Sequence, residues 1–505
     1  MSNDAGPEQV VRADVVIIGS GMGGSTLAWA LRDAGADVLV LERGQRLPVE
    51  PENSDPAQMH LMKRYRTAEQ WIDGQSGRLF DPGVYYWVGG NTKFYGACLP
   101  RFRVSDFEEV EHADGTSPAW PFRYADLEPH YVEAERLYRV HGDGSEDPTE
   151  PPRSGPYPYP RLEHEARVAA FADSLASSGL HPFHMAGGMD LDTQEARVAS
   201  TASDGCPDQH GHKSDAENRA LEPALATGNV RLMTGVHVTR LEARGRVVRA
   251  AFAEQDGQSL RIEADRFVLA AGAVNTAALL LGSVGADHPG GLANSSGLVG
   301  RRYMVHNSTF FVAVDPRRRN ETAWQKTLGL NDWYEAGPGV PYPLGNLQML
   351  GKLRTPMIKA ARPWVPGPVL DFMTSRSLDI YLTTEDLPRR ENRVRVTRRG
   401  IAVDWRPNNL KPHSELVRRV TKVVRRAGYP LVFTQRMGIE TNSHQCGTAV
   451  AGHDPATSVL DADCRAHDLD NLWLADSSFF PSSAALNPAL TIAANALRIA
   501  PRIAG

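Results

Sequence analysis

The hydrophobic pattern near the start of the chain predicts a strand, a glycine turn, a helix and a second strand. Asp14–Ile18 is a short β-branched run of the kind found in buried parallel strands. The turn Gly19–Gly24 follows at once, and Ser25–Ala34 has helical spacing. Val38–Leu41 is a second apolar run, and it ends at Glu42. This order is typical of the first unit of a doubly wound parallel sheet.

Apolar runs farther along the chain predict a second sheet of another kind. Between residues 299 and 405, strand-like pieces are separated by Pro and Gly turns, which favours an antiparallel sheet. Asp147–Pro160 is rich in proline and is therefore expected to be an extended surface linker. The other expected strands are Val230–Val238, Val247–Phe252, Leu260–Ala270, Thr309–Val314, Leu378–Thr383 and Arg393–Val396. The other expected helices are Met59–Trp71, Ser414–Ala427 and Pro488–Ile499.

Composition and charge exclude several classes of protein. The 505 residues are 41% hydrophobic and 23% charged, which is the balance of a soluble globular protein. A net charge of -5 argues against a nucleic-acid binder, and no apolar run approaches the roughly 20 residues needed to cross a bilayer. The start of the chain has no signal-peptide pattern, and the four cysteines lie far apart. We therefore expect a cytoplasmic protein with reduced thiols and no contact with membranes.

The glycine turn has a specific chemical use. Gly19 permits the tight turn, Gly21 lets the backbone approach a pyrophosphate, and Gly24 allows close packing of helix on strand. The following helix then presents its free N–H groups to the phosphates. Glu42, at the end of the second strand, is placed to accept hydrogen bonds from both ribose hydroxyls. A dinucleotide site is therefore expected here.

Two later strands favour FAD over a nicotinamide cofactor. Arg266–Gly272 is a buried strand that ends in small residues, and Leu472–Asp476 is a second strand with an acid at its tip. Strands of this kind that return to the dinucleotide, one of them with Asp near the ribityl chain, recur in FAD-binding folds.

Five segments carry recognisable motifs, namely the turn Gly19–Gly24 and Gly89–Gly96, Gly272–Thr276, His444–Thr448 and Asp476–Pro488. Through these motifs the chain resembles the glucose–methanol–choline (GMC) oxidoreductases over its whole length, and the inserted middle is the weakest part of the match. The segments 120–122, 127–131 and 479–483 carry a finer likeness within the family, to the bacterial pyranose 2-oxidases and glycoside 3-oxidases.

The resemblance implies a mixed α/β fold with a Rossmann-like FAD-binding domain and an inserted α+β substrate domain built on an antiparallel sheet. We expect the FAD-binding domain at residues 12–110, 195–305 and 438–505, and the substrate domain at 111–194 and 306–437. The residues implied to bind FAD are Gly19, Gly21, Met22, Gly24, Glu42, Arg43, Gly89, Gly90, Asn91, Tyr95, Gly96, Val238, Ala271, Gly272, Asp476 and Pro488.

His444 and Asn487 are the expected catalytic residues, because the family places a His beside a second His or Asn over the flavin. An imidazole with a pKa near neutrality suits the abstraction of a hydroxyl proton, so flavin reduction is expected to rise with pH through that range. Asn487 has an alternative interpretation, since Asn followed by Pro488 is also a common helix start. The two roles are compatible.

Two departures from the family pattern affect the chemistry. Covalent relatives attach FAD through a histidine at the position occupied here by Phe94, so we expect noncovalent FAD. Gly96 stands where pyranose 2-oxidases tend to carry a hydroxyl residue near flavin N5, which leaves the reaction with oxygen open.

Weaker signals remain. Cys206, His210 and His212 could mimic metal ligands, but no fourth ligand is evident, so a solvated loop and no metal are expected. Alternation puts Asn346 and Gln348 on one face of a strand, where Gln348 could bind a sugar hydroxyl or simply lie on an outer face.

The expected function is oxidation of a secondary alcohol of a pyranose sugar or glycoside, with C3 slightly favoured over C2. FAD takes the hydride, and oxygen reoxidises it to give hydrogen peroxide. Three alternatives stay open: a dehydrogenase of the same fold that uses a quinone or carrier protein, an enzyme for a non-sugar alcohol such as a sterol or choline, and a flavin-binding module without catalysis.

Overall fold

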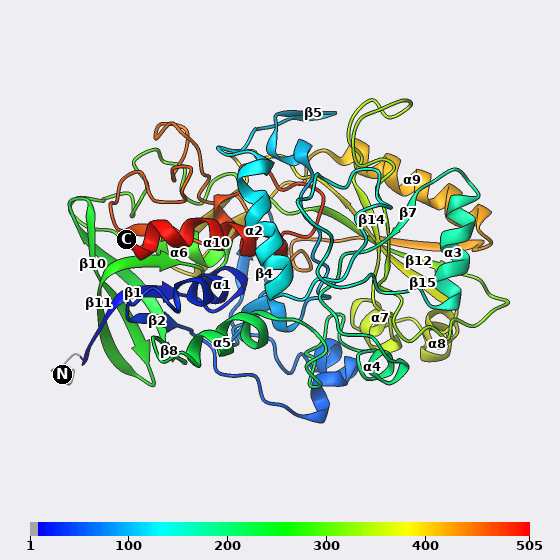
Figure 1. Cartoon of the computed structure of the whole chain (residues 1–505), viewed down its shortest axis with the longest axis horizontal. Helices are drawn as coiled ribbons and strands as arrows, with labels where there is room; N and C mark the ends of the chain where they lie inside the picture. The colour runs from blue at the N-terminus through cyan, green and yellow to red at the C-terminus, as the bar shows by residue number, and fades with distance from the viewer. Residues whose placement is uncertain (1–8) are drawn as a thin grey trace.

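Strands from both ends of the chain form the first sheet, on the left in Figure 1. The computed structural model describes residues 9–505. This sheet has seven strands in the order β8-β2-β1-β11-β10-β9, with β19 also paired to β11. The parallel strands are β1 (Gln9–Ile18), β2 (Val38–Leu41), β8 (Val230–Met233), β11 (Gln258–Leu269) and β19 (Leu472–Leu474). The antiparallel edge is formed by β9 (His237–Arg244) and β10 (Val247–Gln255).

Helices from distant parts of the chain pack around the first sheet. α1 (Met22–Leu31) packs against α10 (Ala489–Ala504), and α10 packs against α2 (Tyr124–Leu137). α6 (Ala273–Gly282) contacts β9. The inner strands are hydrophobic on both faces and are buried accordingly. The first and last elements of the chain therefore share one core, as the sequence pattern predicts.

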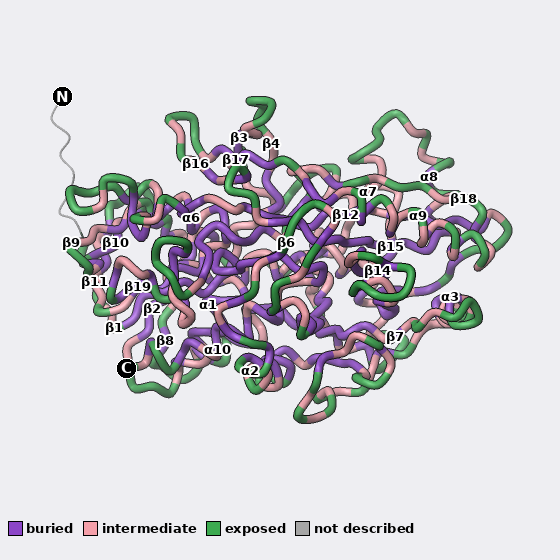
Figure 2. Tube along the Cα trace, turned by 90° about the horizontal axis from the view of Figure 1, so that it is seen from above, coloured by how far each residue is buried: buried purple, intermediate pink, exposed green. Residues whose placement is uncertain are grey.

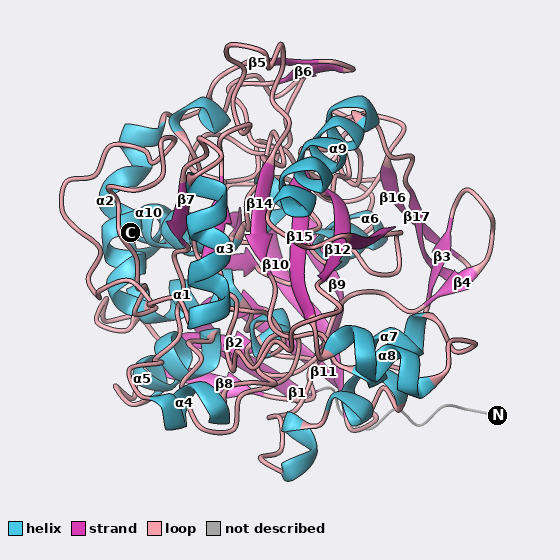
Figure 3. Ribbon diagram, turned by 90° about the vertical axis from the view of Figure 1, so that its right-hand side faces the viewer, coloured by secondary structure: helices cyan, strands magenta, loops and turns pink. Residues whose placement is uncertain are grey.

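The second sheet has six strands, all antiparallel, in the order β18-β12-β15-β14-β13-β7. It lies on the right in Figure 1, and Figure 3 shows the helices α3 (Ala166–Ala176) and α9 (Leu410–Arg426) beside it. The expected mixed α/β fold, with a Rossmann-like sheet and a separate antiparallel sheet, is confirmed. The strands are β7 (Pro182–His184), β12 (Asn307–Val314), β13 (Leu328–Leu330), β14 (Asn346–Met349), β15 (Ser377–Thr384) and β18 (Leu431–Arg436).

The two faces of this sheet differ in polarity because side chains alternate along a strand. Leu347 of β14 and Leu382 of β15 lie opposite each other and pack in one core with residues of α3 and α9. Gln348 of β14 and Tyr381 of β15 are also directly opposite each other, and they lie on the other face. Both faces are buried, and buried residues run through the interior from one sheet to the other in Figure 2. A buried polar face must therefore find partners within the protein.

A third sheet joins segments that the sequence assigns to different domains. It has four strands, β16 (Arg393–Thr397), β17 (Gly400–Asp404), β3 (Trp71–Asp73) and β4 (Leu79–Phe80). Strands from residues 71–80 and 393–404 therefore share one sheet, although the expected domain boundaries place the first pair in the FAD-binding domain and the second in the substrate domain. Those boundaries remain a proposal.

Two sequence-based elements are wrong in detail. The expected helix Met59–Trp71 is absent, and only a short π-helical turn, Ala57–Leu61, forms there before β3. Met59 and Tyr65 of this segment are buried by tertiary contacts instead, whereas Leu61 and Met62 are exposed. The expected strand Val230–Val238 is divided into β8 and β9, which lie at opposite edges of the first sheet. Gly235, with φ +69°, lies between them.

The remaining elements are short. The four cysteines are buried and unpaired. Within residues 9–505, no helix is both long enough and apolar enough to cross a bilayer. The short helices and strands are α4 (Gln194–Ala199), α5 (Glu222–Leu225), α7 (Thr355–Ala361), α8 (Gly367–Thr374), β5 (Val110–His112) and β6 (Gly115–Ser117). Further single turns of 3₁₀ or π helix are Pro51–Ser54, Gly90–Lys93, Val104–Phe107, Glu217–Leu221 and Ser477–Phe479.

Candidate active site

The glycine turn between β1 and α1 needs glycine for steric reasons. Gly19 has φ +108°, a backbone conformation that side-chain-bearing residues rarely adopt. A Cβ on Gly24 would overlap the carbonyl oxygen of Gly19, and a Cβ on Gly23 would overlap that of Ala475. Gly19 and Gly24 thus have the geometry expected of them. Gly23 lies in close contact with the C-terminal segment at Ala475, and the glycine motif did not predict this contact.

Gly21 differs from its neighbours, because the space that a Cβ would fill there is open to 4 Å. Gly21 is also the N-cap of α1, no side chain caps this helix, and its first turn, which starts at Met22, carries no acidic residue. Uncapped N–H groups beside free space are suited to an anionic phosphate. A Cβ on Gly90 would lie 3.2 Å from the Cα of Gly21, so the turn at Gly89, with φ +89°, is packed on this site. These residues fit the pyrophosphate of a dinucleotide.

Glu42 is held at the end of β2 by backbone and hydroxyl donors. Its Oε2 accepts from the backbone N (3.0 Å) and Oγ (2.6 Å) of Ser20, and its Oε1 accepts from Gly44 N at 2.9 Å. Ser20 Oγ in turn accepts from Gly89 N at 3.1 Å. Burial raises the pKa of Glu42, and the three hydrogen bonds oppose this shift. Ser20, which the sequence analysis did not single out, ties the three nucleotide-site segments together.

Asp476 joins the tip of β19 to the start of α6. Its Oδ2 accepts from Gly272 N at 2.9 Å and from the hydroxyl of Thr276, while Oδ1 accepts from Ser478 N at 2.9 Å. Gly272 follows Ala271 and has φ +85° at the N-cap of α6. Asp476 is buried, and burial raises its pKa. A second helix start is therefore fixed at the same edge of the first sheet.

The other residues implied to bind FAD lie around this edge but use their side chains within the protein. The Asn91 amide holds the loop before it, through Tyr85 N (2.9 Å) and Gly83 O (3.2 Å). Arg43 pairs with Glu69 at 2.8 Å and stacks on the Tyr86 ring. Tyr95 donates to Ser214 O at 2.6 Å, and Val238 is buried at the start of β9. Their roles toward FAD remain proposals.

Gly96 and Phe94 occupy the two positions that depart from the family pattern. A Cβ on Gly96 would overlap both Asp204 and Lys326, which pair at 3.1 Å against it. A side chain at position 96 would therefore have to displace this ion pair. Phe94 is buried and stacks on Tyr85 with ring centroids 3.8 Å apart. A phenyl ring has no atom that could bond covalently to a flavin.

His444 is hydrogen-bonded to a second histidine that the sequence analysis missed. The Nδ1 atoms of His444 and His306 are 3.1 Å apart, and the Nε2 of His306 lies 3.1 Å from the carbonyl oxygen of Ser483. A carbonyl oxygen can only accept, so Nε2 of His306 carries a proton. Burial lowers the pKa of His306 to about 4, so its Nδ1 is unprotonated at neutral pH and accepts. His444 must then donate from Nδ1.

This arrangement determines the chemistry of His444. Burial, followed by the influence of His306 and Lys326, lowers the pKa of His444 well below its usual value. A neutral imidazole protonated at Nδ1 has a free lone pair on Nε2. In residues 9–505, no hydrogen bond involves that nitrogen. His444 can therefore accept a proton through Nε2.

Asn487 does not cap α10. The N-cap position is Pro488, which has helical backbone angles and no side-chain capping bond. The Asn487 Oδ1 instead accepts from Nε2 of Gln348 at 2.8 Å. Gln348 is 2% exposed and also donates to Asn346 Oδ1 at 3.2 Å, so the two polar residues do share a face. The alternative that Gln348 lies on an outer face is wrong.

The expected catalytic residues come together at the polar face of the second sheet. The ring centroid of His444 lies 6.5 Å from that of Tyr381. Tyr381 is directly opposite Gln348 in the sheet, and Gln348 is hydrogen-bonded to Asn487. With its oxygen occupied by Gln348, Asn487 keeps its amide nitrogen free to donate, since no described residue accepts from it. One free acceptor and one free donor therefore lie in the same region.

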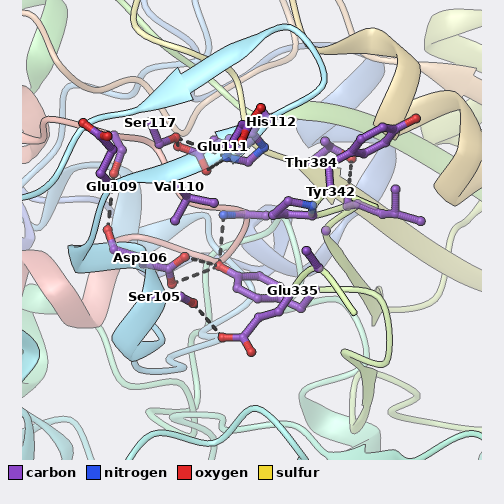
Figure 4. Close-up of a pocket in the computed structure, with 18 of the residues that line it drawn as sticks. Ser105, Asp106, Glu109, Val110, Glu111, His112, Ser117, Glu335, Tyr342 and Thr384 are labelled. Carbon is purple, nitrogen blue, oxygen red and sulfur yellow. Dashed lines mark hydrogen bonds and ion pairs between the residues drawn. The ribbon is translucent and has the colours of Figure 1, made fainter. Parts of the chain in front are cut away.

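An acidic pocket adjoins the loop that leads to Asn487. It has a volume of about 540 Å³ and is lined in part by Ser482 and Ala485. Figure 4 shows Asp106, Glu111 and Glu335 among the side chains that line it. Burial raises the pKa of Asp106 to about 7, and Glu385 is paired with His112 at 3.1 Å. His112 is the only basic side chain in the lining, whereas the carboxylates number five: Asp106, Glu109, Glu111, Glu335 and Glu385.

The Cys206 segment has no arrangement suited to a metal. Across residues 9–505, no three His, Cys, Asp or Glu side chains are grouped so as to hold a metal ion. Cys206 is instead buried with Met59, Tyr65 and Phe94.

Comparisons with known proteins agree with this geometry. Residues 178–308 and 382–496 match two family models described as GMC oxidoreductase, and residues 17–48 match a model described as NAD(P)-binding Rossmann-like domain. Paromamine 6'-oxidase of Streptomyces fradiae is 31% identical, with 97% of this chain and 91% of that protein covered. 6'''-Hydroxyparomomycin C oxidase of Streptomyces lividus is 32% identical with the same coverage. The fructose dehydrogenase large subunit of Gluconobacter japonicus is 27% identical over 98% of both chains.

Solved structures support the fold. Pyridoxine 4-oxidase from Mesorbium loti superposes with a TM-score of 0.67 at 20% identity, covering 97% of this chain and 98% of that one. Formate oxidase superposes with a TM-score of 0.68 at 16% identity, covering 98% of both chains. Together with the two family matches and the full-length relatives, these findings identify the chain as a member of the GMC oxidoreductase family and an FAD-type oxidoreductase.

Proposed function

We propose that this protein oxidises a secondary alcohol on a pyranose sugar or glycoside to the ketone, with C3 slightly favoured over C2. The observation that carries the proposal is a free acceptor, Nε2 of His444, and a free donor, the amide nitrogen of Asn487, which are both linked to the polar face of the second sheet. An alcohol has the matching groups, because its O–H proton can go to His444 while its oxygen accepts from Asn487.

FAD fits the edge of the first sheet described above. The uncapped start of α1 and the open space at Gly21 would hold the pyrophosphate, and Glu42 has room for a ribose hydroxyl, since a carboxylate has about four acceptor positions and the protein fills three. Bound FAD supplies the acceptor for the hydride that leaves the carbon. His444 takes the hydroxyl proton, and Asn487 holds the oxygen as negative charge develops on it.

A polyhydroxylated substrate is favoured by Gln348. Its Oε1 is a buried acceptor with no hydrogen-bond partner among residues 9–505. An unpaired buried acceptor costs about 1–3 kcal/mol, which a second substrate hydroxyl could recover. The polar face that carries Gln348 also argues against a sterol.

Oxygen is the proposed final acceptor, with hydrogen peroxide as product, and a dehydrogenase that uses a quinone is the alternative. The relatives named above include two oxidases and one dehydrogenase. Steady-state rates with oxygen and with an artificial quinone separate the two, because an oxidase keeps its turnover when oxygen is the sole acceptor.

The direct test is anaerobic titration of the yellow protein with glucose, methyl glucosides and simple alcohols. Bleaching by a glucoside, with a 3-keto or 2-keto product identified by NMR, supports the proposal. Bleaching by non-sugar alcohols alone would show that the substrate is not a sugar. No bleaching by any alcohol would leave a flavin-binding protein without this activity.

The acidic pocket favours a second candidate, an amino sugar. Its carboxylates are complementary to a protonated amine, and full-length relatives are named for oxidation of paromamine and of 6'''-hydroxyparomomycin C. Such a substrate could bring a primary alcohol to His444 and give an aldehyde. Including paromamine in the titration decides between the candidates, because the favoured substrate bleaches the flavin at the lower concentration.

A further inference from the structure

Four amide side chains connect a buried carboxylate to the proposed active site. Nδ2 of Asn331 donates to Oδ2 of Asp147 at 2.7 Å, and Nδ2 of Asn346 donates to Oδ1 of Asn331 at 2.7 Å. Nε2 of Gln348 then donates to Oδ1 of Asn346 at 3.2 Å and to Oδ1 of Asn487 at 2.8 Å. Apart from Asn487, which is half-buried, all the members are buried. This series of hydrogen bonds runs from the proline-rich segment, through β14, to Asn487, two residues before the start of α10.

The direction of every bond in this chain follows from its first member. A carboxylate can only accept, so Asn331 must turn its nitrogen toward Asp147 and its oxygen away from it. That oxygen requires a donor, which is the nitrogen of Asn346. The oxygen of Asn346 requires the nitrogen of Gln348, and the two protons of that nitrogen are used by Asn346 and Asn487. Reversing any one amide would place two acceptors or two donors face to face.

Asp147 itself is firmly held as an acceptor. Its Oδ1 takes hydrogen bonds from the backbone N and the hydroxyl of Thr149, both at 2.9 Å. Its Oδ2 is paired with the guanidinium of Arg103, which is buried with it. A buried charge with these partners stays in place, because removing either partner of such a pair is costly.

We propose that Asp147, Asn331, Asn346 and Gln348 are positioning residues that turn the amide nitrogen of Asn487 toward the substrate oxygen. The inference rests on the proposed alcohol oxidation. With the opposite orientation, Asn487 would present its oxygen to the substrate and compete with His444 for the hydroxyl proton. The oxygen that becomes negative would then face a second acceptor instead of a donor. Asp147, Asn331 and Asn346 therefore act only through Gln348 and Asn487, while the Oε1 of Gln348 remains free for the second substrate hydroxyl.

The test is a double-mutant cycle on the rate of flavin reduction in the FAD-loaded protein. Asn346→Leu removes one link and leaves Gln348 and Asn487 in place, so it should slow anaerobic reduction about 10- to 100-fold, the range for a hydrogen bond to a charged group. Substrate affinity should change far less than the reduction rate. In an Asn487→Ala background, Asn346→Leu should have almost no further effect, because the residue through which it acts is gone.

Controls keep the result interpretable. FAD content and the thermal midpoint show whether Asn346→Leu is folded. Asn331→Leu, which breaks the series of hydrogen bonds at a point without substrate contact and has a similar volume, repeats the test under the same two checks. An equal loss of rate in both backgrounds, or an unchanged rate in the folded single variants, would overturn the inference.

Neutron diffraction of the deuterated wild-type protein gives an independent readout. It shows directly whether the deuterons of the Asn487 amide point away from Gln348, and the opposite orientation would refute the inference. If no alcohol reduces the wild-type flavin, the proposed function has failed. The amide orientation is still decided by diffraction, so the two failures are distinguishable.

Discussion

His444 and His306 face each other through their Nδ1 atoms, 3.1 Å apart, with ring planes 73° from each other. Because His306 gives its single proton to the carbonyl of Ser483, His444 is left with its proton on Nδ1 and its lone pair on Nε2. His306 therefore sets the tautomer of the proposed base. Without this contact, both tautomers of a neutral imidazole would be available.

The first prediction follows from that contact. His306→Phe should slow anaerobic flavin reduction roughly 10-fold or more, because the hydrogen bond that orients His444 is lost. His306→Gln should recover most of the rate, since its oxygen can accept from His444 while its nitrogen donates to Ser483. ¹⁵N NMR of histidine-labelled protein should show His444 protonated at Nδ1 in wild type and in the Gln variant. Equal rates for wild type and His306→Phe would contradict the prediction.

The second prediction concerns His444 and pH. His444→Ala should purify yellow with normal FAD content but reduce roughly 10²–10⁴-fold more slowly in stopped flow. Only the neutral imidazole accepts the proton, and the pKa of His444 is lowered by burial, by His306 and by Lys326, whose own charge faces Asp204. The rate due to His444 should therefore be flat around neutral pH and fall only well below pH 6.5. This differs from the rise through neutrality that an ordinary histidine would give.

A third prediction separates folding from FAD binding at the glycine turn. Gly24→Ala places a methyl group on the Gly19 carbonyl oxygen, so it should lower the free energy of unfolding by about 1–3 kcal/mol or more. Gly21→Ala places the same methyl in open space, so the apoprotein should keep its stability. FAD affinity should fall on the order of 10-fold in that variant, or about 1.4 kcal/mol. Denaturant titration of apoprotein and equilibrium dialysis with FAD measure the two effects. Equal stability losses in both variants would show that the turn is packed differently.

The mode of FAD attachment is the fourth prediction. Because Phe94 stands where covalent relatives carry histidine, acid precipitation should leave the yellow colour in the supernatant. Colour retained in the pellet would show a covalent bond to another residue, which peptide mass spectrometry would locate.

The fifth prediction tests the acidic pocket. Glu111 and Glu335 line it and are exposed, so Glu111→Gln and Glu335→Gln should fold normally. Each should raise KM for paromamine by about two- to five-fold at low salt, the range for one exposed charge pair, and leave KM for a neutral glucoside unchanged. Glu195→Gln, on α4 and outside the pocket, is the matched control. Equal changes for charged and neutral substrates would exclude a charge-recognition role.

The nucleotide-binding half could be predicted from the sequence because its signals are local. A buried β-branched strand, a turn whose glycines are required by close contacts, and an acid at the next strand end lie within residues 14–42. Such short-range patterns can be recognised in the sequence without knowledge of any distant contact. The helix expected at Met59–Trp71 was wrong because apolar spacing alone cannot show that Tyr65 and Trp71 are buried by separate, nonhelical contacts.

Asn487 and His444 were located by sequence, but their partners were decided by the tertiary structure. His306 lies 138 positions from His444, and Gln348 lies 139 positions from Asn487. For Gln348 the antiparallel sheet determines the surroundings, since its register sets Gln348 opposite Tyr381 and turns both toward the same buried face. The residue types alone dictate which side chains can donate or accept hydrogen bonds. The fold decided which of their atoms remain free, because each buried polar group must first satisfy its nearest neighbours.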